Sequence, residues 1–263
     1  MRFIKFLTGA VVIIYFLLCG ALYILQDRII FNPHKLPESF RFSQHEEVEI
    51  EVEADVYLHG LWLRERQPKG VILYLHGNRG SNRRCQHQAR NMANNGYDIL
   101  MVDYRGYGKS DGRVTSEAQL YADVQRVYDY LKEDYAEDQI VVAGYSLGTG
   151  MASYLAAKNS PQQLILVAPY LSFYELKRFH IPLFLPNFLV KYPLDNDAHL
   201  ADVRCPVTIF HGTDDRVIDY SHGAELAEKH PDKVELVTLR GESHRGAIFN
   251  GQFRRRTGEL LRG

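Results

Sequence analysis

The decapeptide VVAGYSLGTG, residues 141–150, places one serine between an apolar run and a series of small residues. Its centre reads Gly-x-Ser-x-Gly, with Ser146 between Gly144 and Gly148. This pattern predicts a buried strand that turns sharply into a helix, with the serine hydroxyl projecting from the end of the sheet. Side chains at the two glycines would collide with adjoining backbone. We therefore predict that Ser146 is a nucleophile; the alternative is an ordinary glycine-rich turn.

The sequence around this turn alternates short apolar runs with helical patterns. The runs are GVILYLHG, YDILMVDYRG, QIVVAGYS, QLILVAPY and PVTIFHG, and continuous apolar runs of this length are typical of strands buried on both faces. Helical patterns cover residues 83–94, 116–133, 147–158, 220–229 and 246–261. Before them, EEVEIEVE and VYLHGLWLR alternate apolar and polar residues, which predicts an antiparallel pair at the sheet edge. We predict an α/β fold with a mostly parallel, doubly wound sheet.

A serine hydroxyl needs a base within hydrogen-bond reach, and in such a fold the expected chain order is nucleophile, acid, histidine. The base is predicted at His244, in a loop after KVELVTL, which is the last predicted strand. The acid is predicted at Asp215, which follows the strand PVTIFHG, with Asp214 and then Asp195 as alternatives. Two backbone N–H groups should stabilise the oxyanion. We predict those of Leu147, at a helix start, and Asn78, after the turn at Gly77.

Composition excludes several other classes. The chain has 263 residues and a formal net charge of -1, which gives no indication of a nucleic-acid partner. Its 3 cysteines do not form a disulfide framework, and no metal-binding motif is present. We therefore expect no metal site. The oligomeric state is left open.

The N-terminal segment is a predicted membrane anchor. Residues 6–25 carry no charged side chain and, as a helix, would span about 30 Å, the hydrocarbon thickness of a bilayer. A cleaved signal peptide is the alternative, although the run is long and lacks a small-residue cleavage site. We expect an anchor over 1–26, a connector over 27–44 and a catalytic domain over 45–263. Basic residues are nearly balanced across the span, and we expect the domain on the non-cytoplasmic side.

The chain resembles the α/β-hydrolase superfamily over about residues 45–263. The matching segments are LYLHGNRGSN, DYRGYGKSDG, GYSLGTG and HGTDDRVIDYSHG, together with YILQDRIIFNP, which precedes this range and leaves the predicted anchor. Within it the sequence looks like the membrane-anchored branch that includes relatives of the bud-emergence protein and eukaryotic protein depalmitoylases. The resemblance implies nucleophile, acid and base at Ser146, Asp215 and His244, ester or thioester hydrolysis, and no cofactor. The chain departs from the family in the step Ser243-His244 and in a basic loop with Arg79, Arg83 and Arg84.

Residues 170–199 form an insert that is expected to cap the catalytic end of the sheet. Its apolar centre and the neighbouring anchor favour an acyl chain entering from the bilayer; the alternative is an insert that only closes the core. The predicted pocket residues are Tyr145, Phe179, Phe184 and Phe188. The sequence thus predicts a membrane-anchored serine hydrolase for carboxylic esters or thioesters. A serine peptidase or amidase, and a catalytically silent scaffold, are the alternatives.

Overall fold

The computed structural model describes residues 2–43, 45–93, 95–180 and 186–262, except the side chains of residues 2 and 177–180. Its main sheet has the strands β2 (Glu46–Glu53), β3 (Val56–Leu63), β4 (Val71–Leu75), β6 (Asp98–Val102), β7 (Ile140–Tyr145), β8 (Gln163–Val167), β9 (Val207–Gly212) and β10 (Val234–Leu239). Their order is β10-β9-β8-β7-β4-β6-β3-β2. Neighbours from β10 to β6 pair in parallel, whereas β3 and β2 are antiparallel. The predicted fold class and the antiparallel edge are confirmed.

The chain also forms eight described helices. They are α1 (Arg2–Ile30), α2 (Asn82–Ala89), α3 (Glu117–Leu131), α4 (Gly148–Lys158), α5 (Phe173–His180), α6 (Asn196–Asp202), α7 (Tyr220–Lys229) and α8 (Gly251–Leu260), with 3-10 turns η1 (Glu137–Gln139), η2 (Asn187–Leu189) and η3 (Ala247–Phe249). Of these helices, α2 and α8 pack on one face of the sheet and α3, α4, α6 and α7 on the other. Successive strand residues point to opposite faces, so Leu73 joins the core under α3, α4, α6 and α7, and Tyr74 the core under α2 and α8. Burial on both faces explains the continuous apolar runs.

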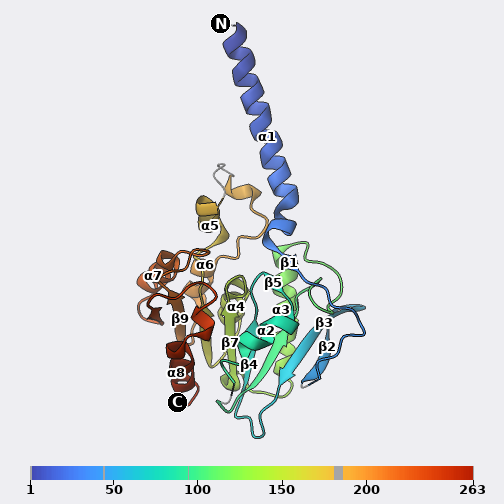
Figure 1. Cartoon of the computed structure of the whole chain (residues 1–263), viewed down its shortest axis with the longest axis vertical. Helices are drawn as coiled ribbons and strands as arrows, with labels where there is room; N and C mark the ends of the chain where they lie inside the picture. The colour runs from blue at the N-terminus through green and yellow to red at the C-terminus, as the bar shows by residue number, and fades with distance from the viewer. Residues whose placement is uncertain (1, 44, 94, 181–185, 263) are drawn as a thin grey trace.

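Helix α1 projects from the domain and contacts it at its C-terminal end, next to the insert (Figure 1). The most apolar 18-residue window of its segment Phe3–Ile30 has a mean hydropathy of 2.3, and only 6% of that window is buried. A soluble core helix would be mostly buried, so the length and exposure of α1 are consistent with a membrane span. The helix continues to Ile30, four residues beyond the predicted end of the anchor at residue 26.

The segment after α1 joins the domain through a second, small sheet. Strand β1 (Asn32–Pro33) pairs in parallel with β5 (Arg79–Gly80), in the loop that follows β4. The Asn32 N–H donates to the Asn78 carbonyl at 3.1 Å, and the His34 N–H donates to the Gly80 carbonyl at 3.0 Å. The predicted connector is thus hydrogen-bonded to the loop that should supply an oxyanion donor.

Two predicted helix boundaries were wrong. Helix α2 ends at Ala89 rather than 94, because the Asn91 side chain donates to the carbonyls of His87 and Gln88 and satisfies the last turn. Helix α8 begins at Gly251 rather than 246, because Asn250 is an N-cap that accepts from two backbone N–H groups. Both ends are set by local side-chain hydrogen bonds rather than by the apolar pattern.

Candidate active site

The turn between β7 and α4 holds Ser146 at the end of the sheet. Ser146 has φ of 54°, a left-handed conformation that is strained for a residue with a side chain. A Cβ at Gly148 would lie 2.0 Å from the Leu75 carbonyl oxygen, and one at Gly144 would lie 2.6 Å from the Gly148 oxygen. Both glycines are therefore required for the close approach of α4 to the strand ends. The strained turn is stabilised by the Thr149 hydroxyl, which donates to the Ser146 carbonyl at 2.6 Å.

The structure brings the three predicted polar residues into one hydrogen-bonded line. His244 Nε2 lies 3.0 Å from Ser146 Oγ, and His244 Nδ1 lies 2.7 Å from Asp215 Oδ2. An ionised carboxylate only accepts hydrogen bonds, so the proton of the neutral imidazole sits on Nδ1. Nε2 is then free to accept from the serine hydroxyl. This is the arrangement that activates a serine as a nucleophile.

Asp215 is held as a buried carboxylate. Burial raises its pKa, but hydrogen bonds from His211 and His244 and from the backbone outweigh this and hold the pKa well below its ordinary value. Its Oδ1 accepts from the N–H groups of Val217 and Ile218 at 2.8 and 2.9 Å. These bonds leave Oδ2 directed at His244.

The alternative acids do not contact His244. Asp214 is exposed and accepts a hydrogen bond from Thr213. Asp195 is the N-cap of α6 and accepts from the Ala198 N–H. Other strand-end histidines have structural partners: the His211 ring lies against the Ile218 carbonyl, and the His76 ring lies against the Gly77 carbonyl. Of the predicted acids, only Asp215 is brought to the histidine.

Two backbone N–H groups flank the serine without an acceptor. In the described part of the chain, neither the Asn78 nor the Leu147 N–H has a hydrogen-bond acceptor. The Leu147 N–H lies at the N-terminal end of α4, where the helix dipole favours negative charge. The Asn78 loop is fixed because its carbonyl accepts from Asn32 and from the Tyr107 hydroxyl. Such donors could stabilise an oxyanion.

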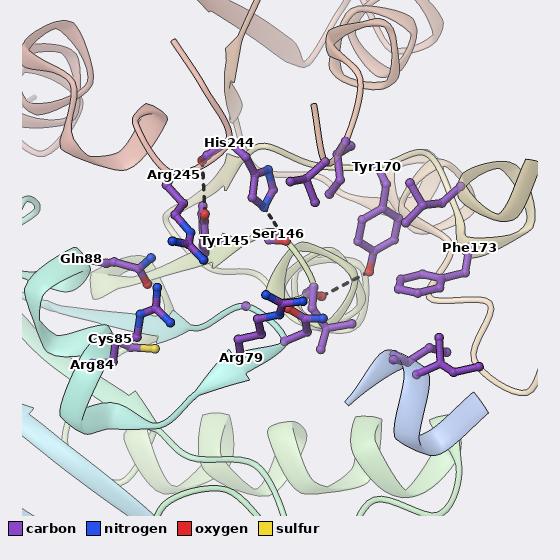
Figure 2. Close-up of a pocket in the computed structure, with 18 of the residues that line it drawn as sticks. Arg79, Arg84, Cys85, Gln88, Tyr145, Ser146, Tyr170, Phe173, His244 and Arg245 are labelled. Atoms are coloured by element: carbon purple, nitrogen blue, oxygen red, sulfur yellow. Dashed lines mark hydrogen bonds between the residues drawn. The ribbon is translucent and has the colours of Figure 1, made fainter. Parts of the chain in front are cut away.

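A cavity of about 750 Å³ opens over Ser146 (Figure 2). Its size is typical of small-molecule sites. Of the predicted pocket residues, Tyr145 lines it, whereas Phe188 is 83% exposed and does not. Phe184 and the side chain of Phe179 lie outside the described residues. The insert instead contributes Phe173, Leu176 and Val190, which were not predicted.

Solved structures of other proteins share the fold of this chain. An esterase of Pyrococcus furiosus superimposes with a TM-score of 0.71 over 88% of this chain and 97% of its own, at 21% identity. The family model for "Serine aminopeptidase, S33" matches residues 66–190, which include the serine turn. The likeness to the solved esterase shows that the chain has the α/β-hydrolase fold.

The chain is also similar in sequence to curated proteins named as lipases or as α/β-hydrolase domain-containing proteins. The chain is 32% identical to the Xenopus tropicalis "Lysophosphatidylserine lipase ABHD12" over 179 residues, covering 59% of this chain and 45% of the lipase. It is also 32% identical to the human "Alpha/beta hydrolase domain-containing protein 17B" over 169 residues, covering 62% of this chain and 56% of that protein. The chain thus spans about half the length of these relatives.

Further cavity residues come from elements whose proximity could not be predicted from the sequence. Helix α1 contributes Leu22, Gln26, Ile29 and Ile30. These residues line the cavity only because α1 docks on the domain, and hydropathy does not predict this docking. Phe173 and Leu176 are three residues apart and share a helix face, a spacing that could have been read as an amphipathic helix. Among the described residues, no group of three or more His, Cys, Asp and Glu side chains is placed to hold a metal ion.

Proposed function

We propose that the chain is a membrane-anchored serine hydrolase that cleaves carboxylic esters or thioesters, including those of long acyl chains. The observation that carries this proposal is the hydrogen-bonded line from Asp215 through His244 to Ser146, which ends in a cavity lined mainly by apolar side chains. An unperturbed glycine-rich turn would need neither the left-handed serine nor the oriented histidine.

The proposed reaction has two steps. Ser146 Oγ attacks the carbonyl carbon while His244 Nε2 takes the hydroxyl proton, and the N–H groups of Asn78 and Leu147 hold the oxyanion. The C–O or C–S bond then breaks, and the imidazolium returns the proton to the leaving alkoxide or thiolate. In the second step, His244 activates water, which hydrolyses the acyl-enzyme and restores the serine hydroxyl. Asp215 orients the ring and stabilises its charged form.

We further propose that α1 anchors the catalytic domain to a membrane. Its hydropathy, length and low burial support a span, followed by a connector over 27–44 and the catalytic domain over 45–263. We propose that the catalytic domain lies on the non-cytoplasmic side of the membrane. The test is to introduce a cysteine at the exposed position Asp214 and to treat intact cells with an impermeant maleimide. Labelling in intact cells would support this orientation, whereas labelling only after lysis would place the domain in the cytoplasm.

A serine peptidase is the second candidate, because the matching family model is described as a serine aminopeptidase. The same triad hydrolyses amides when the site protonates an amine leaving group.

Full-length protein in detergent should be assayed on matched acyl esters, thioesters and amides, with Ser146→Ala as baseline. We expect ester or thioester turnover to exceed amide turnover and to vanish in Ser146→Ala. Preferential amide cleavage would favour the peptidase, and no cleavage together with no fluorophosphonate labelling would favour a silent scaffold.

A further inference from the structure

One wall of the cavity over Ser146 belongs to the membrane-anchor helix. Leu22, Ile29 and Ile30 of α1 line the cavity together with Phe173 and Leu176 of the insert. These side chains carry no polar group, so this end of the cavity suits a hydrocarbon chain. Leu22 lies within the apolar run of α1, and Ile29 follows it by two turns. The apolar end therefore adjoins the level at which the chain would leave a bilayer.

Helix α1 is docked on the domain rather than tethered to it. The buried Gln26 side chain donates from Nε2 to the Leu189 carbonyl at 2.7 Å and accepts from the Lys191 N–H at 2.8 Å. The next residue, Asp27, accepts a hydrogen bond from the Tyr192 hydroxyl at 2.8 Å. A buried amide with both ends satisfied fixes the helix against the insert. These hydrogen bonds hold the α1 wall against the cavity.

The other side of the same cavity is cationic. Arg84 and Arg245 lie on one side of Ser146, and Phe173 lies on the other (Figure 2). Arg79 also lines the cavity. Within the described residues none of these three arginines forms an ion pair, although ion pairs are formed by Arg64, Arg105 and Arg256. Guanidinium groups gathered without carboxylates are suited to bind a phosphate or carboxylate.

The position of His244 indicates which side of the cavity binds the leaving group and which side binds the acyl group. The leaving group must come within hydrogen-bond reach of His244 Nε2, which returns the proton to it. Arg245 follows His244 in the same loop, and the charges of Arg245 and Arg84 both act on the phenol of Tyr145, whose hydroxyl donates to the His244 carbonyl. The cationic side is therefore the leaving-group side, and the acyl group lies toward α1.

We propose that this site hydrolyses single-chain acyl esters or thioesters whose leaving group carries a phosphate or carboxylate, with the acyl chain packed against α1 and the anion held by Arg84 and Arg245. This inference rests on the proposed hydrolase function and adds the substrate class and its direction in the cavity. It also makes the last two turns of the anchor helix part of the substrate site.

The anion side is tested with two substrates that differ only in a phosphate: 1-palmitoylglycerol and 1-palmitoylglycerol 3-phosphate, in phosphatidylcholine vesicles containing the full-length protein. We expect the phosphate to be preferred. The double variant Arg84→Gln/Arg245→Gln should lower the ratio of kcat/KM for phosphate over neutral substrate roughly tenfold, mainly through KM, because it removes two partly exposed charge pairs. Arg83→Gln is the matched control, since Arg83 lies over Phe40 and does not line the cavity. An unchanged ratio in the double variant would overturn the anion assignment.

A second arm distinguishes the source of the anion. Palmitoyl-coenzyme A carries its phosphates on a soluble thioester, whereas the glycerol phosphate is membrane-bound. If the double variant lowers kcat/KM for either anionic substrate, the result supports an anion site formed by Arg84 and Arg245. The substrate with the larger kcat/KM identifies whether a lipid or a soluble thioester is the better fit.

The acyl side is tested with monomeric p-nitrophenyl esters from butyryl to dodecanoyl. In the wild type, kcat/KM should rise by up to about fourfold per methylene while the chain extends along α1. Ile29→Trp fills this end and should lower the dodecanoyl-to-butyryl ratio about tenfold or more, and Leu22→Trp should act in the same direction. Ile24→Trp is the matched control, because Ile24 is 71% exposed on the same helix and does not line the cavity.

Butyryl ester hydrolysis reports whether each variant is folded. It also distinguishes a failure of the α1 acyl site from a failure of the hydrolase function. Butyryl turnover with chain-length ratios unaffected by both tryptophan variants would overturn the α1 acyl site and leave the hydrolase function standing. No ester turnover by the wild type, at any chain length, would overturn the hydrolase function itself.

Discussion

Replacement of Gln26 by methionine tests whether the anchor helix is part of the catalytic domain. Methionine keeps the length and unbranched shape of the side chain but cannot make the two hydrogen bonds. The Leu189 carbonyl and the Lys191 N–H would both lose their partner at a site where Gln26 is only 7% exposed. At about 1 kcal/mol for each net hydrogen bond, the docked state of α1 should lose roughly 2 kcal/mol relative to the undocked state.

The Lys191 amide reports this loss directly, because its N–H donates to Gln26. A change of roughly 2 kcal/mol in a local opening equilibrium increases hydrogen exchange about 30-fold. We would measure hydrogen–deuterium exchange by mass spectrometry on peptides covering residues 186–192, in full-length protein reconstituted in nanodiscs. Arg28→Met is the control, because Arg28 is the second residue after Gln26 and is exposed. Equal exchange at Lys191 in wild type and Gln26→Met would refute the docking of α1 on the insert.

Other substitutions test the site and its support. Asp215→Asn should reduce kcat about 10⁴-fold through loss of the correct histidine tautomer, whereas Asp214→Asn should change ester turnover little; the reverse result would exchange their roles. Because the folded-state pKa of Asp215 is depressed, its stabilising contribution is present above its unfolded pKa of about 3.9 and is lost as the pH falls through the folded-state value. The difference in unfolding free energy between wild type and Asp215→Asn should therefore shrink on acidification below about pH 4, and a constant difference would contradict the shift. Gly148→Ala should destabilise the fold by about 3 kcal/mol or more, because its Cβ would meet the Leu75 carbonyl oxygen at 2.0 Å; Gly251→Ala, with nothing within 4 Å, is the thermal-unfolding control.

Much of the fold could be predicted because its sequence patterns are local. The apolar runs that form β4, β6, β7, β8 and β9 are buried on both faces, and such runs differ visibly from the alternating pattern of β2. The serine turn is also local, since Gly144, Ser146 and Gly148 satisfy steric requirements within one turn. Asp215 and His244 follow strand patterns whose ends meet at one edge of the sheet.

The cavity walls could not be predicted in the same way. Whether Leu22 and Ile29 face lipid or substrate depends on the hydrogen bonds of Gln26 and Asp27 to residues more than 160 positions away. The aromatic residue Phe188 was expected in the pocket from its apolar surroundings, yet it lies on the outer surface of the insert at 83% exposure. Hydropathy predicts that a residue avoids water, but tertiary contacts decide which apolar surface it meets.

The central claim is that Ser146 is a nucleophile activated by His244. The most direct measurement is the intact mass of the full-length protein after reaction with a fluorophosphonate, followed by peptide mapping. The account predicts one covalent adduct, on Ser146, that is absent in Ser146→Ala and forms far more slowly in His244→Ala. A folded wild-type protein without an adduct, or an adduct that persists in Ser146→Ala, would contradict it.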